Sequence, residues 1–196
     1  MIHLLKKNIK KTEPLYLNME QLYQSLRTKT KKKWDRVLPF NELLVDRWEK
    51  ANFLNAKKGS SVYDSSYIYG NVIIGKNTWI GPHTILDGSG GKLSIGNFCS
   101  ISSGVQIYTH NTVKWALTGG KSEPEKKSVR IGDNCYLGPN SIIGMGTSIG
   151  KCSIIGSLSF VNSKIPPYSI AFGSPARIVG KVIVKGKKVE FEYFEK

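Results

Sequence analysis

The sequence predicts an all-β solenoid of the parallel β-helix type, preceded by helices and followed by a short hairpin. Three observations predict this fold class. Aliphatic residues recur at every sixth position over most of the range 62–161, small residues recur at the fifth place of the same hexads, and glycine is frequent at the second place. A strict period of six fits neither the 3.6 of a helix nor the alternation of a simple strand, and it is typical of a parallel β-helix in which three hexads form a triangular coil.

The first and fifth places of each hexad are expected to point inward and to stack from coil to coil. The first places are Val62, Ile68, Ile74, Ile80, Leu86, Ile95, Ile101, Ile107, Ile131, Leu137, Ile143, Ile149, Ile155 and Val161. The fifth places include Ser66, Val72, Thr78, Thr84, Cys99, Val105, Cys135, Ser141, Thr147, Ser153 and Ser159. Glycine at the second place is expected to permit the backbone conformation of the corner.

The three cysteines support the same interpretation. Cys99 and Cys135 occupy the small inward place, and together with Cys152 they form no C-x-x-C pair. An odd number without such spacing indicates neither a disulfide framework nor a zinc knuckle. We therefore expect reduced, packed thiols.

Two interruptions break the repeat. The spacing from Leu86 to Ile95 is nine, so "GSGGKL" is expected to bulge from a corner. The spacing from Ile107 to Ile131 is 24, which leaves 18 extra residues for an extruded loop over residues 111–128. Solenoids usually place such insertions on one face, and that face is often functional.

The flanking segments complete the predicted organisation. Residues 1–58 show helical spacing at Leu22/Leu26 and again at Leu43/Leu44/Arg47/Trp48, broken by Pro39, which predicts two helices capping the open end of the solenoid. The solenoid is expected over residues 59–182. Residues 183–196 are expected to contain a terminal hairpin, because residues 181–184 and 188–194 alternate in polarity around Gly186.

The charge is strongly positive, at +15, and it is spread along the chain. Residues 1–58 hold 14 lysines and arginines against 6 acidic residues, and residues 59–196 hold 15 against 8. Such a surface suits nucleic acid, anionic lipid or a polyphosphate, and charge alone does not choose among them. No stretch resembles a membrane span or a signal peptide, so a cytoplasmic protein is expected, and peripheral membrane contact stays open.

The hexads, the interruption that follows a histidine and the later "KIPPYSIAFGSPARIVGKV" resemble the hexapeptide acyltransferases of the left-handed β-helix type. Within that family the chain looks most like the sugar O- and N-acetyltransferases of surface polysaccharide biosynthesis, near the galactoside and maltose acetyltransferases. The resemblance covers residues 60–182. It implies a left-handed solenoid, acetyl-CoA as co-substrate, no metal, and a homotrimer with active sites shared between subunits.

His110 is the candidate general base. It directly precedes the long insertion and matches the catalytic histidine of the resembled family, and imidazole can remove a proton near neutral pH. Asp87 should stack under Tyr108 and close to His110, where the family places an acidic residue that orients the histidine or contacts the acceptor. The alternative for Asp87 is a corner-turn residue beside Gly88. His83 is expected to be an exposed turn residue, and His3 is assigned no role.

The resemblance also implies a cofactor groove along the later coils. Gly138 and Ser157 would let the pantetheine arm approach, and Lys164, Arg177 and Lys181 could face its phosphates. Pro139 is a departure from the family pattern, because proline lacks the backbone N–H that a residue at this corner could donate to the pantetheine arm. Tyr108 and Trp115 could stack on a sugar ring or could anchor the loop.

The leading functional hypothesis is therefore acetyl transfer from acetyl-CoA to a hydroxyl or amine of a free, nucleotide-linked or lipid-linked sugar. A γ-type carbonic anhydrase on the same architecture needs three metal-binding histidines, which the repeat lacks. The non-enzymatic alternative is a basic β-helix scaffold that binds nucleic acid or an anionic glycan. The sequence leaves open the acceptor, the choice of O- or N-transfer and the acyl group.

Overall fold

The computed structural model describes residues 14–195, so His3 lies outside the described residues. The described chain divides into two compact units at Asp46/Arg47. The first contains α2 (Pro14–Trp34) and α3 (Phe40–Leu44), in which the rings of Tyr23 and Phe40 meet edge to face with centroids 5.3 Å apart. None of the described helices is long and apolar enough to cross a membrane.

Residues 14–58 contain three helices where the spacing predicted two. The second predicted helix breaks because Val45 is extended, with φ −100° and ψ 124°, so that α3 ends before it and α4 (Arg47–Phe53) begins anew. β-branched residues favour this extended backbone. The predicted cap over the solenoid by α2 and α3 stays a prediction.

Helix α4 belongs to the second unit and packs on its first coil. Ala51 is buried in the core cluster of the solenoid. Lys50 Nζ donates to the backbone oxygens of Tyr63, Asp64 and Ser66 at 3.2, 2.7 and 3.1 Å. One ammonium group thus satisfies three carbonyls of a turn in the first coil.

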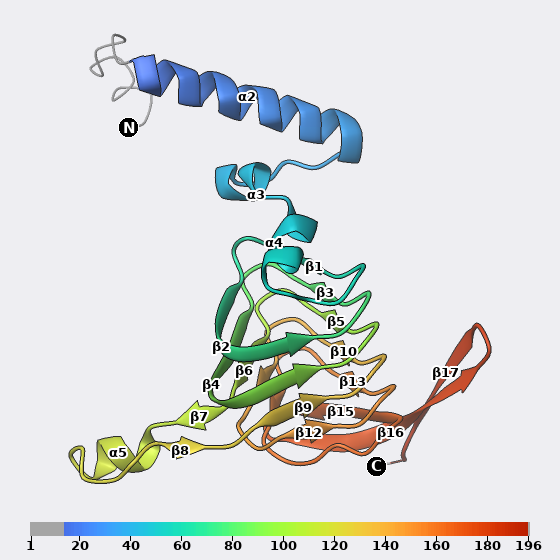
Figure 1. Ribbon diagram of the computed structural model, residues 1–196. Helices are drawn as coiled ribbons and strands as arrows, with labels where there is room; N and C mark the ends of the chain where they lie inside the picture. Colours follow the sequence, from blue (N-terminus) through green and yellow to red (C-terminus); the bar gives the residue numbers. More distant parts are fainter. Residues whose placement is uncertain (1–13, 196) are drawn as a thin grey trace. The chain divides into compact units, whose positions relative to one another are not determined.

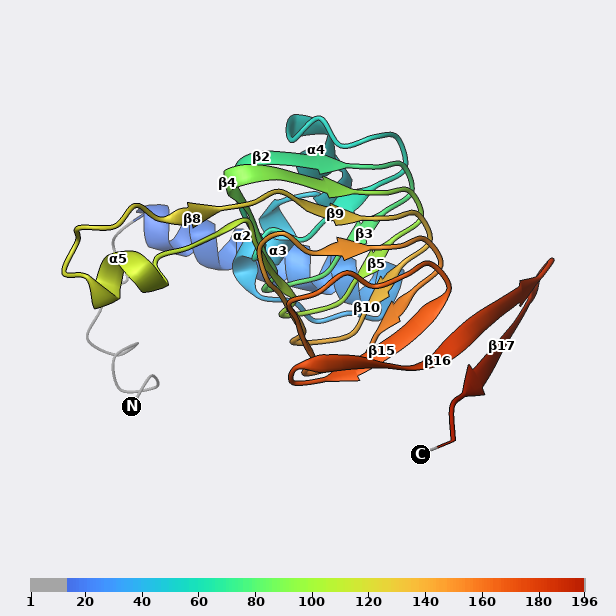
Figure 2. The same cartoon turned by 90° about the horizontal axis from the view of Figure 1, so that it is seen from below.

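The second unit is a stack of triangular coils, as Figures 1 and 2 show. It has three faces, and the coil strands within each face run parallel to one another. Face 1 consists of β1 (Ser61–Val62), β3 (Trp79–Ile80), β5 (Ser100–Ile101), β10 (Tyr136–Leu137), β13 (Ile154–Ile155) and β15 (Ser169–Gly173). Face 2 consists of the first halves of β2 (Tyr67–Ile74) and β4 (Ile85–Ile95), with β6 (Gln106–Tyr108), β11 (Ile142–Ile143) and β14 (Phe160–Val161). Face 3 consists of the second halves of β2 and β4, with β9 (Val129–Ile131), β12 (Ser148–Ile149) and a bridge to Ile165.

The inward positions confirm the hexad prediction. Every predicted first- and fifth-place residue is buried except Ile68 and Val72, which are partly buried and pack against the same core. Several fifth-place hydroxyls donate to the second-place carbonyl of the next coil, as Ser66 Oγ does to Gly81 O at 2.8 Å. Cys99 Sγ lies 3.1 Å from Gly132 O in the same arrangement, so cysteine replaces serine at this place.

The prediction that second-place glycines permit an unusual backbone conformation at the corner was wrong. The left-handed backbone falls at the fourth place, at Asn77, His83, Phe98, Asn134, Asn140, Cys152, Leu158 and Tyr168. The second-place glycines other than Gly144 serve close stacking instead: a Cβ on Gly150 would lie 2.2 Å from the backbone nitrogen of Pro167 in the next coil. Glycine is therefore required there by backbone contact between coils and not by an unusual φ.

Both interruptions occur at the corner between faces 2 and 3. The three extra residues of the first lie within β4, whose partner shifts from Gly70↔Gly88 to Val72↔Leu93. The second leaves the next coil as an arm with regular structure: β7 (His110–Asn111) pairs antiparallel with β8 (Glu125–Lys126), and α5 (Val113–Leu117) lies between them. Figures 1 and 2 show this arm extending away from the coils.

The chain ends in antiparallel strands. β16 (Ala176–Lys185) pairs first with β15 and then with β17 (Lys188–Tyr193), with the turn at Gly186. The antiparallel segment therefore begins before residue 183, the predicted start of the terminal hairpin segment.

Candidate active site

His110 lies where the chain leaves the coil. It holds the fourth place of a hexad, but it lacks the left-handed φ found at other fourth places, because here the backbone continues straight into β7. His83, which has φ 58°, lies exposed at a corner between faces 1 and 2. Within one chain the two histidines therefore belong to different corners.

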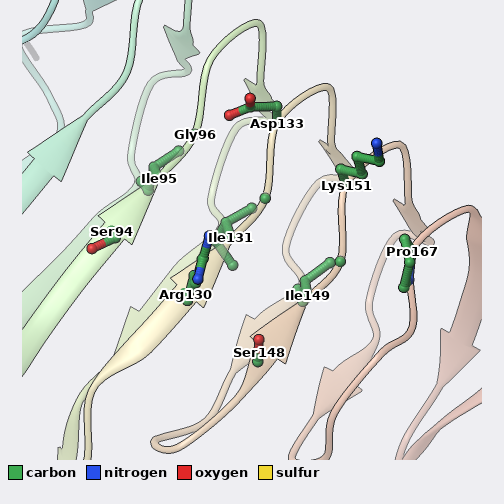
Figure 3. A pocket seen from close by; sticks show the side chains of 12 residues that line it. Ser94, Ile95, Gly96, Arg130, Ile131, Asp133, Ser148, Ile149, Lys151 and Pro167 are labelled. Carbon is green, nitrogen blue, oxygen red and sulfur yellow. The ribbon is translucent and has the colours of Figure 1, made fainter.

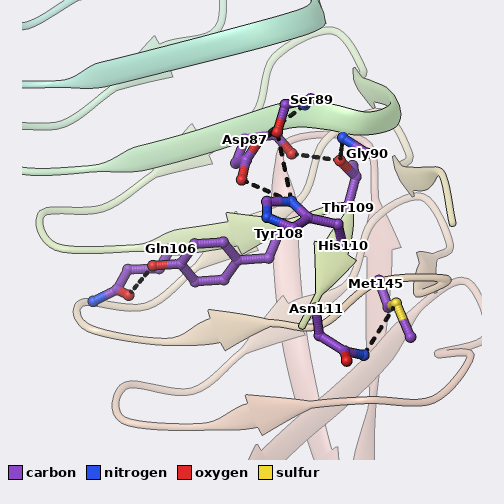
Figure 4. Close-up of polar contacts among 9 residues, drawn as sticks. All are labelled: Asp87, Ser89, Gly90, Gln106, Tyr108, Thr109, His110, Asn111 and Met145. Atoms are coloured by element: carbon purple, nitrogen blue, oxygen red, sulfur yellow. Dashed lines mark hydrogen bonds and ion pairs between the residues drawn. The ribbon is translucent and has the colours of Figure 1, made fainter. Parts of the chain in front are cut away.

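Thr109 fixes the root of the arm. Its backbone N–H and its hydroxyl donate to the backbone oxygen of Asp87 at 3.1 and 2.9 Å, and the hydroxyl accepts the N–H of Gly90 at 3.0 Å. Its own carbonyl accepts the N–H of Lys127 at 2.8 Å from the returning strand of the arm. These bonds, shown in part in Figure 4, hold the residue before His110 against the preceding coil.

Asp87 and His110 form a pair across neighbouring coils. Asp87 stands opposite Tyr108 in the parallel register, as stacking of the hexads predicts. Its Oδ2 lies 3.1 Å from His110 Nδ1, with the Asp87 side chain 8% exposed and that of His110 32% exposed. A carboxylate at Nδ1 orients the ring and leaves Nε2 with the lone pair when Nδ1 carries the proton. The imidazole can then accept a proton on its other side.

Ser89 supports this carboxylate from the first interruption. Its backbone N–H donates to Asp87 Oδ1 at 2.8 Å, its hydroxyl donates to the same oxygen, and that hydroxyl lies 3.5 Å from His110 Nδ1. Gly90 lies so close to the histidine that an added Cβ would be 2.4 Å from His110 Cβ. Residues of the first interruption, Ser89 and Gly90, thus pack against His110, which directly precedes the second interruption.

Ser89, Gly90 and Thr109 are not among the site residues predicted from the sequence, although the sequence contains a signal for them. Leu86, Ile95, Ile101 and Ile107 are three hexad steps, which make one coil, so the two interruptions had to share a corner. The coil count that places Asp87 next to Tyr108 also places "GSGG" beside His110.

Tyr108 lies beside this pair on face 2. Its hydroxyl donates to Gln106 Oε1 at 2.7 Å, and partial burial, followed by the nearby Asp87 and Tyr69, raises the pKa of the phenol above its ordinary value. The phenol is therefore neutral at physiological pH and can donate or accept a hydrogen bond.

Polar contacts stiffen the arm beyond His110. Asn111 Nδ2 lies 3.3 Å from Glu125 Oε2, and Lys114 Nζ lies 2.8 Å from Glu125 Oε1. The bonds to Lys114 and then Asn111 hold the pKa of Glu125 below its usual range. Trp115 is in α5, where its ring is near Gly120 and half exposed, so the structure places it on the projecting arm and not beside the His110–Asp87 pair.

The structure brings only some of the five predicted cofactor residues together in one chain, since Arg177 is the register partner of Phe172, which stacks on Gly156 beside Ser157. Gly138 and Ser157 stack at the corner between faces 1 and 2, where a Cβ on Gly138 would lie 2.6 Å from Ser157 N, so coil packing already requires this glycine. Pro139 accepts the N–H of Leu158 at 3.0 Å. Lys164 lies on face 3 beside the bridge residue Ile165, whereas Arg177 and Lys181 are exposed on β16.

A shallow groove of about 470 Å³ runs along face 3 and its following corner (Figure 3). Its lining comes from four successive coils and includes Ser94, Arg130, Asp133, Ser148, Lys151 and Pro167. None of the residues predicted for the site lines it.

Comparison with known proteins agrees with this fold. Residues 128–169 match the family model described as bacterial transferase hexapeptide (six repeats). No curated protein matches the chain. The hexapeptide repeat predicted from the sequence is thereby confirmed for the later coils.

Solved structures extend the likeness to most of the solenoid. A mutant of AntD, an N-acyltransferase from Bacillus cereus, in complex with dTDP and Coenzyme A is 21% identical with a TM-score of 0.57, over 70% of this chain and 89% of that chain. Another AntD mutant, in complex with dTDP-4-amino-4,6-dideoxyglucose and Coenzyme A, is 20% identical with a TM-score of 0.52, over 67% and 87%. The hexapeptide-repeat acetyltransferase VCA0836 from Vibrio cholerae is 20% identical with a TM-score of 0.49, over 87% and 94%. The chain has the solenoid fold of the AntD structures.

Proposed function

We propose that the protein is an acetyl-CoA-dependent acetyltransferase that acetylates a hydroxyl or amine of a sugar in surface polysaccharide or glycan biosynthesis. The observation that carries the proposal is the His110–Asp87 pair, at 3.1 Å, set at the corner where both interruptions of the repeat meet. A histidine oriented by a carboxylate is suited to remove a proton from an attacking hydroxyl or amine.

The residues divide the work of the reaction. His110 Nε2 accepts the proton of the acceptor as its oxygen or nitrogen bonds to the acyl carbon, and the proton then passes to the departing thiolate of CoA. Asp87 holds the ring through Nδ1, and Ser89 holds Asp87. The Ser89 hydroxyl lies 3.5 Å from His110 Nδ1, but it donates its proton to Asp87 Oδ1, so it supports the carboxylate and is not set up as a nucleophile. Within residues 14–195 none of the three cysteines is hydrogen-bonded to His110, which supports direct transfer over a covalent acyl-enzyme.

The choice of substrates rests on the solved relatives. The AntD complexes contain coenzyme A together with dTDP or a dTDP-linked amino sugar, and one contains 3-hydroxybutyryl-CoA. We carry over a CoA thioester as donor and a sugar as acceptor, with acetyl as the acyl group to test first. Gly138, Ser157, Lys164, Arg177 and Lys181 remain the proposed contacts to CoA, and Tyr108 and Trp115 the proposed contacts to the acceptor.

Within one chain, Gly138 and Ser157 lie at the corner between faces 1 and 2, whereas His110 lies at the corner between faces 2 and 3, and this separation supports a homotrimer with sites between subunits. The outward residues of face 2 also support it, because that face carries exposed apolar side chains at Tyr67 in the first coil and at Ile142 and Phe160 in two successive later coils. Symmetric association would remove this row from water.

The test is a screen of free sugars and nucleotide sugars, each bearing hydroxyl or amine acceptors, with acetyl-CoA while free thiol is followed. The wild-type protein should release thiol in step with acetylated sugar, His110→Ala should not, and His83→Ala, which alters the exposed histidine at another corner, should match wild type. Thiol release that is equal in wild type and His110→Ala would refute the assignment. Absence of transfer to any acceptor, with polyanion binding that falls steeply with salt, would favour the basic scaffold instead.

A further inference from the structure

The outward residues of the three faces differ in chemistry. The residue before each first-place aliphatic points outward, and parallel pairing sorts these residues into one row per face. Face 2 presents Tyr67, Ile85, Gln106, Ile142 and Phe160. Face 3 presents Ile73, Ser94, Arg130 and Ser148, and Lys164 follows because Ile165 bridges to Ile149. Face 2 is mainly apolar, whereas face 3 becomes polar and basic along the row.

Arg130 stands between two short hydroxyl side chains. Ser94 and Ser148 are its register partners on either side, and Figure 3 shows the three side chains along neighbouring strands. Arg130 is exposed, and within residues 14–195 no carboxylate lies within ion-pair distance of its guanidinium. Its five N–H donors are therefore available to a ligand, and the flanking serines leave room for one.

Two further cations stand near Arg130. Lys151 lines the same groove, and Lys164 is two strands along the row from Arg130, about 10 Å at the usual strand spacing. The one acidic side chain in the groove, Asp133, is engaged, since its Oδ1 accepts the backbone N–H of Asn97 at 2.8 Å and its amide at 3.2 Å. The groove thus offers two positively charged hydrogen-bond donors, Arg130 and Lys151.

The row is close to the candidate active site along the chain. Lys127, whose N–H bonds to the carbonyl of Thr109 beside His110, precedes Arg130 by three residues, or about 10 Å of extended strand. A ligand whose reacting group meets His110 could therefore extend along face 3 toward Arg130.

We propose that the row Ser94–Arg130–Ser148–Lys164 binds a phosphate or diphosphate group of a substrate. The planar guanidinium of Arg130 binds two phosphate oxygens at once, the two serine hydroxyls donate beside it, and Lys164 adds a second positive charge. The site adds phosphate recognition to the proposed function, and its link to catalysis rests on that proposed function. The phosphate belongs either to the sugar acceptor, as in a nucleotide sugar, or to CoA.

Isothermal titration at about 0.15 M salt tests the site without turnover. The probes are inorganic pyrophosphate, dTDP and CoA, and the variants are Arg130→Gln, Lys164→Gln and the control Lys187→Gln, which removes one charge at the exposed hairpin turn. Arg130→Gln should weaken pyrophosphate binding about tenfold or more, the usual effect of losing a charge-assisted hydrogen bond. Lys164→Gln should weaken it less, and Lys187→Gln should leave it unchanged.

The other two probes identify the source of the phosphate. Weaker dTDP binding with unchanged CoA binding would assign the site to the acceptor, and the reverse would assign it to CoA. Pyrophosphate affinity that is undetectable in wild type, or equal in Arg130→Gln and wild type, would overturn the proposal. Because these are binding measurements, Arg130-dependent pyrophosphate binding without any acetyl transfer would retain the site and refute only the proposed function.

Discussion

The carboxylate of Asp87 reaches the imidazole of His110 from the preceding coil, with Oδ2 3.1 Å from Nδ1. The two residues are far apart in sequence, and the parallel register between β4 and β6 brings them together. Thr109 joins the same two coils, because its hydroxyl donates a hydrogen bond to the backbone oxygen of Asp87. A change at either residue should therefore affect proton transfer much more than it affects the stacked core.

Replacing His110 by alanine should abolish most transfer while the protein folds normally. His110 lies outside the hydrophobic column, so its loss leaves no cavity there. General-base assistance is typically worth about 100- to 10,000-fold in rate, and a loss in that range is expected in kcat. Initial rates of thiol release with a true acceptor measure it, with circular dichroism to check the fold. A variant with wild-type turnover would remove His110 from the mechanism.

Asp87→Asn should lower the rate by holding the imidazole in the wrong tautomer. The amide oxygen can still accept the bonds from Ser89, but the amide N–H₂ then faces His110 Nδ1 as a donor and leaves the proton on Nε2. We expect a loss of about 100-fold in kcat, smaller than that of His110→Ala, and an unchanged KM for acetyl-CoA. If instead KM rises and kcat is preserved, Asp87 contacts a substrate and does not orient the base.

Gly90→Ala should impair catalysis through position alone. An added Cβ would lie 2.4 Å from His110 Cβ, so the histidine must move. A displacement of about 1 Å at a reacting group can cost about 100-fold in rate, and local overpacking typically costs about 1–3 kcal/mol of stability. Gly144→Ala is the matched control, because the nearest atom to its Cβ is 3.4 Å away, an ordinary contact. Equal rates for the two variants would show that Gly90 does not set the position of His110.

Much of this arrangement could be predicted from the sequence because the hexad repeat specifies burial residue by residue. Ile107 and Leu86 lie in one stacked column, and that fact alone places Asp87 under Tyr108. The repeat also predicts thiols such as that of Cys99 as packed inward groups. These inferences succeed because parallel stacking leaves one register for each coil.

Other features depend on geometry that residue type does not specify. The left-handed backbone falls on asparagine and glycine at several fourth places, but also on Phe98 and Leu158, so residue type marks it only in part. The break between α3 and α4 depends on a local extended conformation at Val45 within an otherwise helical pattern. The basic row on face 3 becomes visible only when outward residues are sorted by coil, since Arg130 and Ser94 are 36 residues apart in sequence.

Charge on face 2 should prevent the proposed association. Phe160 and Ile142 are register partners with exposed side chains, and they extend an apolar row on that face. Phe160→Lys should leave the coil folded, because Val161 and not Phe160 points into the core. Light scattering should then report a trimer for wild type and a monomer for the variant, with transfer lost alongside. The control is Lys187→Gln, which should stay trimeric, and a wild-type monomer that is fully active at high dilution would refute shared sites.

Shortening the arm should separate acceptor binding from the rest of the protein. If residues 111–127 are replaced by a plain turn, β9 can still pair with β4 and β12, so the column and the association should persist. Acceptor transfer should collapse, because the arm that begins at His110 and carries Trp115 would no longer wall the site. Acetyl-CoA affinity should change less, since its proposed contacts lie on later coils and on β16.

Two titrations on the shortened protein decide this outcome: acetyl-CoA binding by calorimetry and acceptor dependence by initial rate. A milder variant, Glu125→Gln, removes the carboxylate that joins Lys114 and Asn111 without shortening the chain, and it should raise the acceptor KM with little effect on acetyl-CoA. Because the bonds to Lys114 and Asn111 lower the pKa of Glu125, wild type should keep this contact until the pH falls below the ordinary range of a glutamate. Unchanged acceptor kinetics in the shortened protein would show that the arm has no part in acceptor recognition and that His110 acts without it.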